Sequence, residues 1–159
     1  MTLTSIHNFF AKLLGSFFYT AFLPLAPATW ASMVALPVAW FLWRLPLLWA
    51  LPFFAISLVL AVWSAGAYDR LLGSHDNRLV VIDEAMGVLL VTMGLEHTYV
   101  NYFLALVLFR IFDNWKPFPA NWIDEKVSGG LGVVVDDLVA AIYALLLLVL
   151  FSFFRTHFL

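Results

Sequence analysis

The sequence lacks cysteine and has little charge. None of its 159 residues is cysteine, which excludes disulfides, zinc–thiolate sites and a cysteine nucleophile. Only 11% of the residues are charged, and the net charge of −2 provides no basic surface for nucleic acid. By contrast, 64% are hydrophobic, whereas a small soluble domain buries only about two-thirds of its chain surface. These properties exclude a soluble globular fold and indicate that lipid is the solvent for much of the chain.

Apolar runs divide the chain into segments of membrane length. At about 20 residues per helical span there is room for four to six segments, so 1–159 is predicted to be one domain. The first 25 residues contain one basic residue, Lys12, and no small-residue cleavage pattern, so we expect no removable signal peptide. We predict an interfacial or re-entrant helix over 7–22, interrupted by Gly15. Deeper helices are predicted over 30–43, 47–67, 99–115 and 133–154, with a half-span at 85–94 and polar stretches over 68–84 and 120–132.

The segment 85–115 admits two topologies. In a single crossing, the eight basic residues divide four and four between the two faces of the membrane. In a hairpin with its tip at Glu96 and His97 they divide six and two. Because Lys and Arg concentrate on the cytoplasmic side, we predict the hairpin, with the polar face cytoplasmic. The predicted fold is therefore all-α: a polytopic integral membrane helical bundle with a helical hairpin and an N-terminal interfacial helix.

Half of the ten acidic residues lie in or beside apolar runs. An ionisable group costs roughly 2.5–3.5 kcal/mol at the centre of a membrane helix, so five such acids require compensating charge. Only Arg110 and Lys116 lie in the same neighbourhood, and five acids against two cations leave a deficit of three. One or two divalent ions would cover it, and oxygen ligands without cysteine suit Mg²⁺, Mn²⁺ or Ca²⁺ rather than zinc. The predicted metal ligands are Asp83, Glu84, Asp113, Asp136 and Asp137.

The run from Arg110 to Pro119 combines charges of both signs on one helix face. Arg110, Asp113 and Lys116 recur every three residues, so the face presents a cation, a carboxylate and a cation. This pattern suits a metal-bridged phosphate, with Arg110 giving forked donors and Lys116 a point charge. The alternative is a simple ion pair between Arg110 and Asp113, with Lys116 extending its side chain away from the apolar core.

Four further positions have both a functional and a structural interpretation. Asp83 and Glu84 are either metal ligands or an N-cap and first-turn acid at a helix start. Gly130, in the glycine-rich turn 129–132, either cradles phosphate with its backbone N–H or forms a tight entry turn. Thr29 is either a phosphate contact or a helix cap. Asp136 and Asp137 favour function, because they fall inside the predicted helix rather than before it.

Three motifs together resemble one family. Residues 80–87 (VVIDEAMG) resemble an IVxDExxG motif, residues 109–119 (FRIFDNWKPFP) resemble FRxxDxxKPxP, and residues 124–137 (DEKVSGGLGVVVDD) resemble DxxxxGGxGIMxDD. In this order and spacing they are similar to the phosphatidylglycerophosphatase A family. The family's PGTxGS pattern appears as Pro27 to Ser32 with Ala28 and Ala31 at its glycine positions, which changes any backbone contact with phosphate there.

The resemblance implies an integral membrane, Mg²⁺-dependent lipid phosphatase. Its family reaction converts phosphatidylglycerophosphate to phosphatidylglycerol and inorganic phosphate during phospholipid biosynthesis in the bacterial cytoplasmic (inner) membrane. We expect the five acids named above to supply one or two Mg²⁺ sites. We expect the phosphate to be held by Arg110 and Lys116, with Thr29 and Gly130 as further contacts. The catalytic residues are then Asp83, Asp113, Asp137, Arg110 and Lys116.

Two mechanisms and two other classes of protein remain open at this point. A water molecule activated at the metal could attack phosphorus directly, or one aspartate could form a phosphoryl intermediate. A CDP-alcohol phosphotransferase also uses acidic metal clusters, but its Asp-Gly-x-x-Ala-Arg run is absent from this sequence. A non-enzymatic membrane carrier of ions or solutes, or a scaffold with buried acids, would use Arg110 and Lys116 as internal counter-ions.

Overall fold

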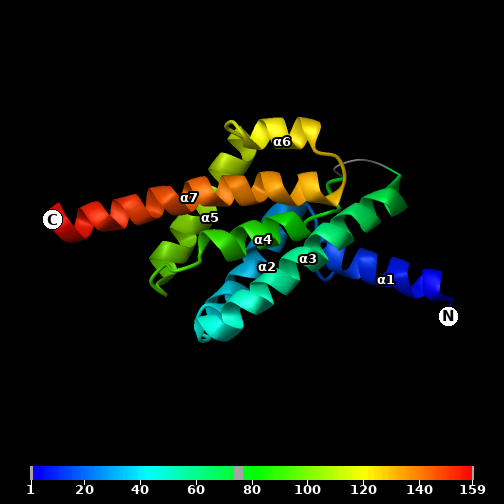
Figure 1. Ribbon diagram of the computed structural model, residues 1–159, viewed down its shortest axis with the longest axis horizontal. Helices are drawn as coiled ribbons and strands as arrows, with labels where there is room; N and C mark the ends of the chain where they lie inside the picture. Colours follow the sequence, from blue (N-terminus) through cyan, green and yellow to red (C-terminus); the bar gives the residue numbers. More distant parts are fainter. Residues whose placement is uncertain (1, 74–76, 159) are drawn as a thin grey trace.

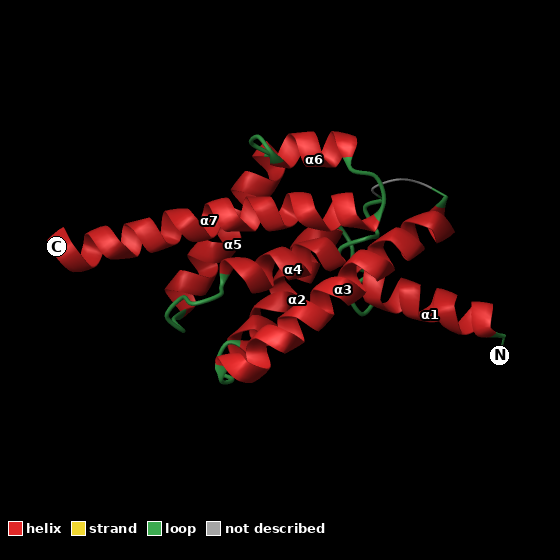
Figure 2. Ribbon diagram, in the orientation of Figure 1, coloured by secondary structure: helices red, strands yellow, loops and turns green. Residues whose placement is uncertain are grey.

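All of the regular secondary structure in the part of the sequence that the structure describes is helical. A computed structural model describes residues 2–73 and 77–158, and these contain seven α-helices, one 3₁₀ turn and no strand. The elements in chain order are α1 (Leu3–Gly15), η1 (Thr20–Phe22), α2 (Pro27–Leu42), α3 (Leu47–Leu72), α4 (Ile82–Val91), α5 (Tyr99–Trp115), α6 (Ala120–Lys126) and α7 (Gly130–Phe158). The predicted all-α class is therefore confirmed (Figure 2).

Two helices are long and apolar enough to cross a membrane. They are α3 and the portion Gly130–Arg155 of α7, with mean hydropathies of 2.1 and 2.5. Only 17% of the most apolar stretch of α3 is buried, although such a helix in a soluble protein would lie in the core. Large apolar side chains such as Leu48, Val59 and Phe151 are exposed instead. Such surfaces are costly in water and suit contact with lipid chains.

Helix α4 lies at the centre of the bundle, with α2, α3, α5 and α7 packed around it (Figure 1). Its small residues allow this close approach, since a side chain added at Gly87 would collide with the ring of Phe109 on α5. The same device joins α3 to α7. A side chain at Gly130 would collide with the backbone carbonyl of Val62 and with Gly66. Close packing of backbones thus fixes the first turn of α7 against α3.

Helices α4 and α5 form the predicted hairpin. An ion pair joins Glu84 near the start of α4 to Arg110 near the end of α5, so these two ends lie together. At the other end, the ring of Trp40 on α2 contacts the rings of His97 and Tyr102 near the hairpin tip. The predicted shape is confirmed, and the cytoplasmic placement of the polar end stays a prediction.

Several predicted boundaries are wrong. Helix α3 continues to Leu72 instead of ending at 67, because Gly73 adopts the left-handed conformation that closes a helix. Helix α7 begins at Gly130 rather than 133, and α6 occupies part of the predicted polar stretch. The segment 7–22 is not one helix. Helix α1 ends at Gly15, residues Phe17 to Tyr19 have positive φ, and η1 follows.

Candidate active site

The five predicted acids converge at one end of the bundle. Asp83 and Glu84 occupy the first turn of α4, Asp113 lies near the end of α5, and Asp136 and Asp137 lie in the second turn of α7. Electrostatic interactions link Asp83 with Glu84, and Asp113 with Asp137. The charge of Asp83 also acts on Asp137, and that of Asp136 on Asp83. We call these five residues the acidic cluster.

The acidic cluster is buried rather than spread over a surface. The exposed fractions are 7% for Asp83 and 4% each for Asp136 and Asp137. The N-cap of α4 is Val81, so the interpretation of Asp83 as an N-cap is wrong. Both acids do lie in the first turn, where a helix dipole favours negative charge. The dipole therefore helps to stabilise these two carboxylates without explaining their burial.

Arg110 connects two helices at this site. Its Nη1 lies 2.8 Å from Oδ2 of Asp113 on the same helix and 3.7 Å from Oε1 of Glu84 on α4. The expected ion pair within α5 is present, and the guanidinium also reaches across the hairpin. These contacts do not have hydrogen-bond geometry, so the buried Nη1 has no hydrogen-bond partner. Arg110 therefore retains donor capacity towards a ligand.

Lys116 points into the site. It caps α5 with a left-handed backbone (φ 45°), and its Nζ lies 2.6 Å from Oδ2 of Asp136 and 3.1 Å from Oδ1 of Asp124. The interpretation of an outward-extending side chain is thus wrong. Burial lowers the pKa of the Lys116 ammonium, and the hydrogen bonds and charges of Asp136 and Asp124 raise it by more. The net pKa is above the ordinary lysine value, so Lys116 stays protonated at neutral pH.

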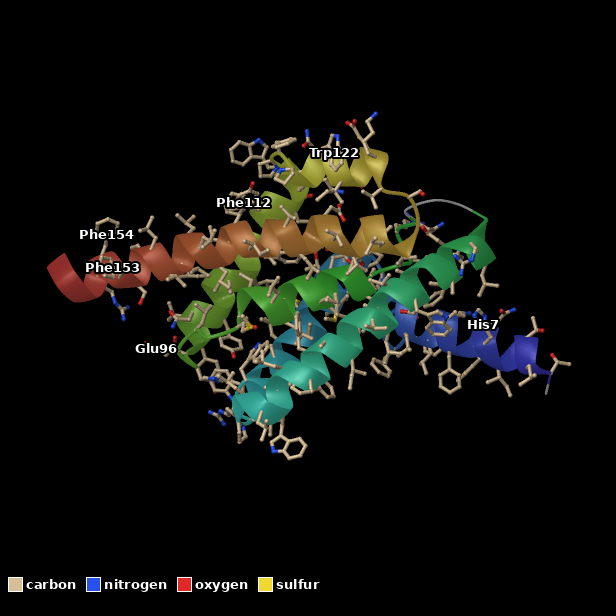
Figure 3. All side chains as sticks on the ribbon, viewed as in Figure 1. His7, Glu96, Phe112, Trp122, Phe153 and Phe154 are labelled. Atoms are coloured by element: carbon tan, nitrogen blue, oxygen red, sulfur yellow. The ribbon has the colours of Figure 1, made fainter. Side chains whose placement is uncertain are left out.

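Asp124, on α6, is a site residue that the sequence analysis did not assign. It holds Lys116 together with Asp136, and its side chain is about one-third exposed. Its position as the first residue of the DxxxxGGxG block was the available indication. Tyr143 on α7 fixes the loop between Lys116 and α6, because its hydroxyl donates a hydrogen bond of 2.7 Å to the Phe118 carbonyl. Trp122 is exposed on α6, in a part of the molecule well separated from Glu96 at the hairpin tip (Figure 3).

Four carboxylates of the acidic cluster have a buried oxygen without a hydrogen-bond partner: Asp83 Oδ1, Glu84 Oε2, Asp136 Oδ1 and Asp137 Oδ2. Unpaired buried carboxylate oxygens are costly, and hard oxygen donors of this kind suit a divalent cation such as Mg²⁺. In the described residues, no group of three His, Asp or Glu side chains is arranged to hold a metal ion. The donor set therefore fits such a cation by chemistry and burial, and three-ligand binding would require carboxylates to turn towards it.

The other two predicted phosphate contacts have different surroundings. Gly130 is buried, and its packing against Val62 and Gly66 already accounts for a glycine there. Thr29 is half-buried in the first turn of α2, whose N-cap is Ala26, so the interpretation of Thr29 as the cap is wrong. None of the ion pairs found in the described chain joins α2 to the acidic cluster.

Comparison with known proteins gives a consistent family. A family model described as Phosphatidylglycerophosphatase A matches residues 13–152. The Escherichia coli K12 protein of that name is 34% identical over 75% of this chain and 70% of its own length. The Haemophilus influenzae protein of that name is 36% identical over 76% of each chain. A Bacteroides thetaiotaomicron protein provisionally named phosphatidylinositol-3-phosphatase is 32% identical over 89% of this chain and 92% of its own. No solved structure matches the chain.

Proposed function

The chain belongs to the phosphatidylglycerophosphatase A family, and from this premise we propose that it hydrolyses the terminal phosphate monoester of phosphatidylglycerophosphate, giving phosphatidylglycerol and inorganic phosphate. The observation that carries the proposal is the meeting of the acidic cluster with Arg110 and Lys116 at one end of the bundle. A phosphatase acting on a lipid requires cations for the phosphoryl oxygens and carboxylates for metal binding or proton transfer. This end of the bundle combines both with apolar helices that suit the lipid chains.

In this proposal the two cations hold the phosphoryl group. Arg110 offers a planar guanidinium, which can donate two hydrogen bonds to phosphate oxygens. Lys116 supplies a compact positive charge three residues after Asp113, whereas Arg110 comes three residues before it. Both cations are anchored by carboxylates, Arg110 by Asp113 and Lys116 by Asp136 and Asp124. Because these charges are already held in position, they need little reorganisation when negative charge develops in the transition state.

We propose Mg²⁺ as the cofactor, held by residues of the acidic cluster. The unpaired oxygens of Asp83, Glu84, Asp136 and Asp137, with Asp113 beside Asp137, are the oxygen donors that support this assignment. When bound, Mg²⁺ would supply Lewis-acid stabilisation of the charge on the phosphoryl oxygens. The cluster residues also exclude bulk water, because three of them are nearly completely buried.

We further propose a multi-pass protein of the bacterial inner membrane that acts in phospholipid biosynthesis, with its site facing the cytoplasm. The exposed apolar faces of α3 and α7, the α4–α5 hairpin and the bacterial relatives support this placement. Exposed aromatic residues at the site end, Trp115, Phe118 and Trp122, suit a membrane–water interface. A cysteine introduced at His97 should react with a membrane-impermeant reagent in right-side-out vesicles. A cysteine introduced at Asn121 should react with it in inverted vesicles. Reaction from one side only would contradict the topology.

A second substrate deserves direct comparison because of the Bacteroides relative. Phosphatidylinositol 3-phosphate also presents a phosphate monoester on a membrane lipid, so the same cations could bind it. The two relatives named for phosphatidylglycerophosphate and the matching family model favour that lipid. A non-enzymatic carrier would likewise place acids in a membrane bundle, but would release no phosphate from either lipid.

The decisive experiment is phosphate release by the purified protein in mixed micelles. We expect release from phosphatidylglycerophosphate with Mg²⁺, loss of release with EDTA, and recovery when Mg²⁺ is restored in excess. Phosphatidylinositol 3-phosphate is the competing substrate in a parallel assay, and the Asp137→Asn protein is the negative control. Absence of release with Mg²⁺, Mn²⁺ or Ca²⁺ would contradict the enzyme proposal. Faster phosphate release from phosphatidylinositol 3-phosphate would identify that lipid as the substrate in place of phosphatidylglycerophosphate.

A further inference from the structure

An apolar groove lies between α2 and α3. The two helices meet at the short connection 43–46, and both pack against α4 while making few contacts with each other (Figure 1). The space between them has a volume of about 350 Å³. Ala85 and Met86 of α4 belong to its lining, together with Phe17 and Phe18 from the segment after α1. Its walls include Val34 and Val38 of α2 and Ile56 and Leu60 of α3.

The groove and the acidic cluster share the first turn of α4. Ile82, Ala85, Met86 and Leu89 line the groove and follow the three-to-four-residue spacing of one helix face. Asp83 directly follows Ile82, so the end of the groove and the first carboxylate differ by about 1.5 Å along the helix axis. An occupant of the groove therefore ends at the depth of the acidic cluster, on the neighbouring face of α4.

The lining of the groove suits an alkyl chain. Its polar side chains are Ser57 and Ser64, and the Ser64 hydroxyl already donates to the Ala61 carbonyl at 3.2 Å. A polar or charged ligand would thus lose its hydration and gain few hydrogen bonds in the groove. An α-helix, about 10 Å across, would fill the volume within one turn, so a partner helix does not fit. The exposed side chains of Phe18 and Ile56 place the mouth on a surface suited to lipid.

We propose that this groove binds one acyl chain of the lipid phosphate whose headgroup reacts at the acidic cluster. The proposal rests on the proposed function, which supplies the phosphate-bearing lipid. Apolar surfaces in a bilayer gain little from the hydrophobic effect, so the groove contributes packing and orientation rather than bulk affinity. An ordered chain beside α4 fixes the depth at which the phosphate meets Arg110 and Lys116. The groove then makes the reaction sensitive to acyl-chain length.

The first test fills the groove. Val34→Trp and Val38→Trp each place a large ring in it, and Val59→Trp is the matched control on an exposed face of α3 outside the groove. The measurement is the ratio of kcat/KM for dipalmitoyl and dibutyryl phosphatidylglycerophosphate in mixed micelles. We expect this ratio to fall about tenfold in both groove variants and to stay constant in Val59→Trp. An unchanged ratio in both, or an equal fall in the control, would overturn the proposal.

The second test needs no catalysis. Wild-type protein in phosphatidylethanolamine vesicles is irradiated with phosphatidic acid carrying a mid-chain diazirine, and the labelled residues are identified by mass spectrometry. We expect label to concentrate on Val34, Val38, Ile56, Leu60 and Met86, and to decrease at the last four of these in Val34→Trp. Label spread over Val59 and Phe103 in proportion to their exposure would overturn the groove. Wild-type protein without phosphate release would contradict the proposed function alone, because the labelling result still decides the groove.

Discussion

The two ends of the helical bundle treat their polar groups in opposite ways. At the site end, the starts of α4 and α7 and the end of α5 bring five carboxylates, and α6 adds Asp124 as a sixth, against two cations. At the hairpin-tip end, the Trp43 indole donates to the Leu89 carbonyl at 2.9 Å, and Arg44 lies over the Trp40 ring at 4.7 Å. All of the buried side-chain polar atoms found without a hydrogen-bond partner in the described residues belong to the site end.

The difference separates residues that hold the fold from residues that serve a ligand. A helical membrane protein gains no stability from unpaired buried carboxylates, so such groups indicate binding or catalysis. Paired groups at the tip end fix α2 against the hairpin and leave nothing for a ligand to satisfy. Substitutions at the site end should therefore change activity more than stability, and substitutions at the tip end should do the reverse.

The largest effect is expected at the acidic cluster. Asp137→Asn and Asp83→Asn remove a carboxylate charge while keeping the shape of the side chain. We expect kcat for phosphate release to fall by at least about 10³-fold. The thermal unfolding temperature in detergent should stay constant or rise, because like charges are separated. Glu96→Gln, at the exposed hairpin tip, is the control and should keep full activity. A folded and fully active Asp137→Asn protein would remove that residue from the site.

Arg110→Lys is expected to have the next largest effect. The substitution keeps the charge but loses the planar fork that contacts Asp113 and reaches Glu84. We expect a loss of about 10²-fold in kcat/KM for phosphatidylglycerophosphate. The corresponding change at the tip end, Arg44→Lys, keeps the cation over Trp40 and should leave kinetics unaltered. Equal losses from both substitutions would mean that the two ends do not differ in function.

A smaller loss of activity is expected for Asp124→Asn. Lys116 then keeps Asp136 as its one ionised partner among the contacts seen here, so its ammonium is less firmly positioned. We expect kcat to fall about tenfold and Asp124→Glu to restore much of it. Glu125→Gln changes the adjacent exposed acid and provides the matched control. Wild-type kcat in Asp124→Asn would show that Asp136 alone positions Lys116.

The smallest effect is expected at the tip end. Trp43→Phe removes the indole N–H and leaves the Leu89 carbonyl without this donor. We expect the free energy of unfolding to fall by about 1 kcal/mol, with kcat and KM unchanged. Trp49→Phe, at an exposed position, should alter neither quantity. A fall in kcat of the folded Trp43→Phe protein would show that the tip end is coupled to the site.

The sequence indicated much of this arrangement because its charges are few. Arg110, Asp113 and Lys116 recur at helical spacing, and charge balance favoured a hairpin that brings them to Asp83 and Glu84. Helix ends were less accessible, since apolar residues continue through them. Gly130 looked like part of an entry turn, and its contact with Val62 shows that it is a packing position inside the first turn of α7.

Two features of the site had no local indication. The inward direction of Lys116 follows from its left-handed backbone and from Asp124 and Asp136 on other helices. The apolar groove exists because α2 and α3 both pack on α4 and make few contacts with each other, which the composition of neither helix indicates. Both depend on contacts between segments far apart in the chain, and sequence spacing reports only neighbours along one helix.

The sequence by itself determined the class of the molecule as a helical membrane protein, because 64% of its residues are hydrophobic and 11% are charged. In such a chain charged residues have few favourable positions outside a functional site. The sequence also determined the family and the identity of the acidic cluster. Only the tertiary structure decided which cation meets which carboxylate, which oxygens remain unpaired, and where the apolar groove lies. The physical reason is that composition sets the solvent of a chain, whereas pairing and cavities depend on how its helices pack against one another.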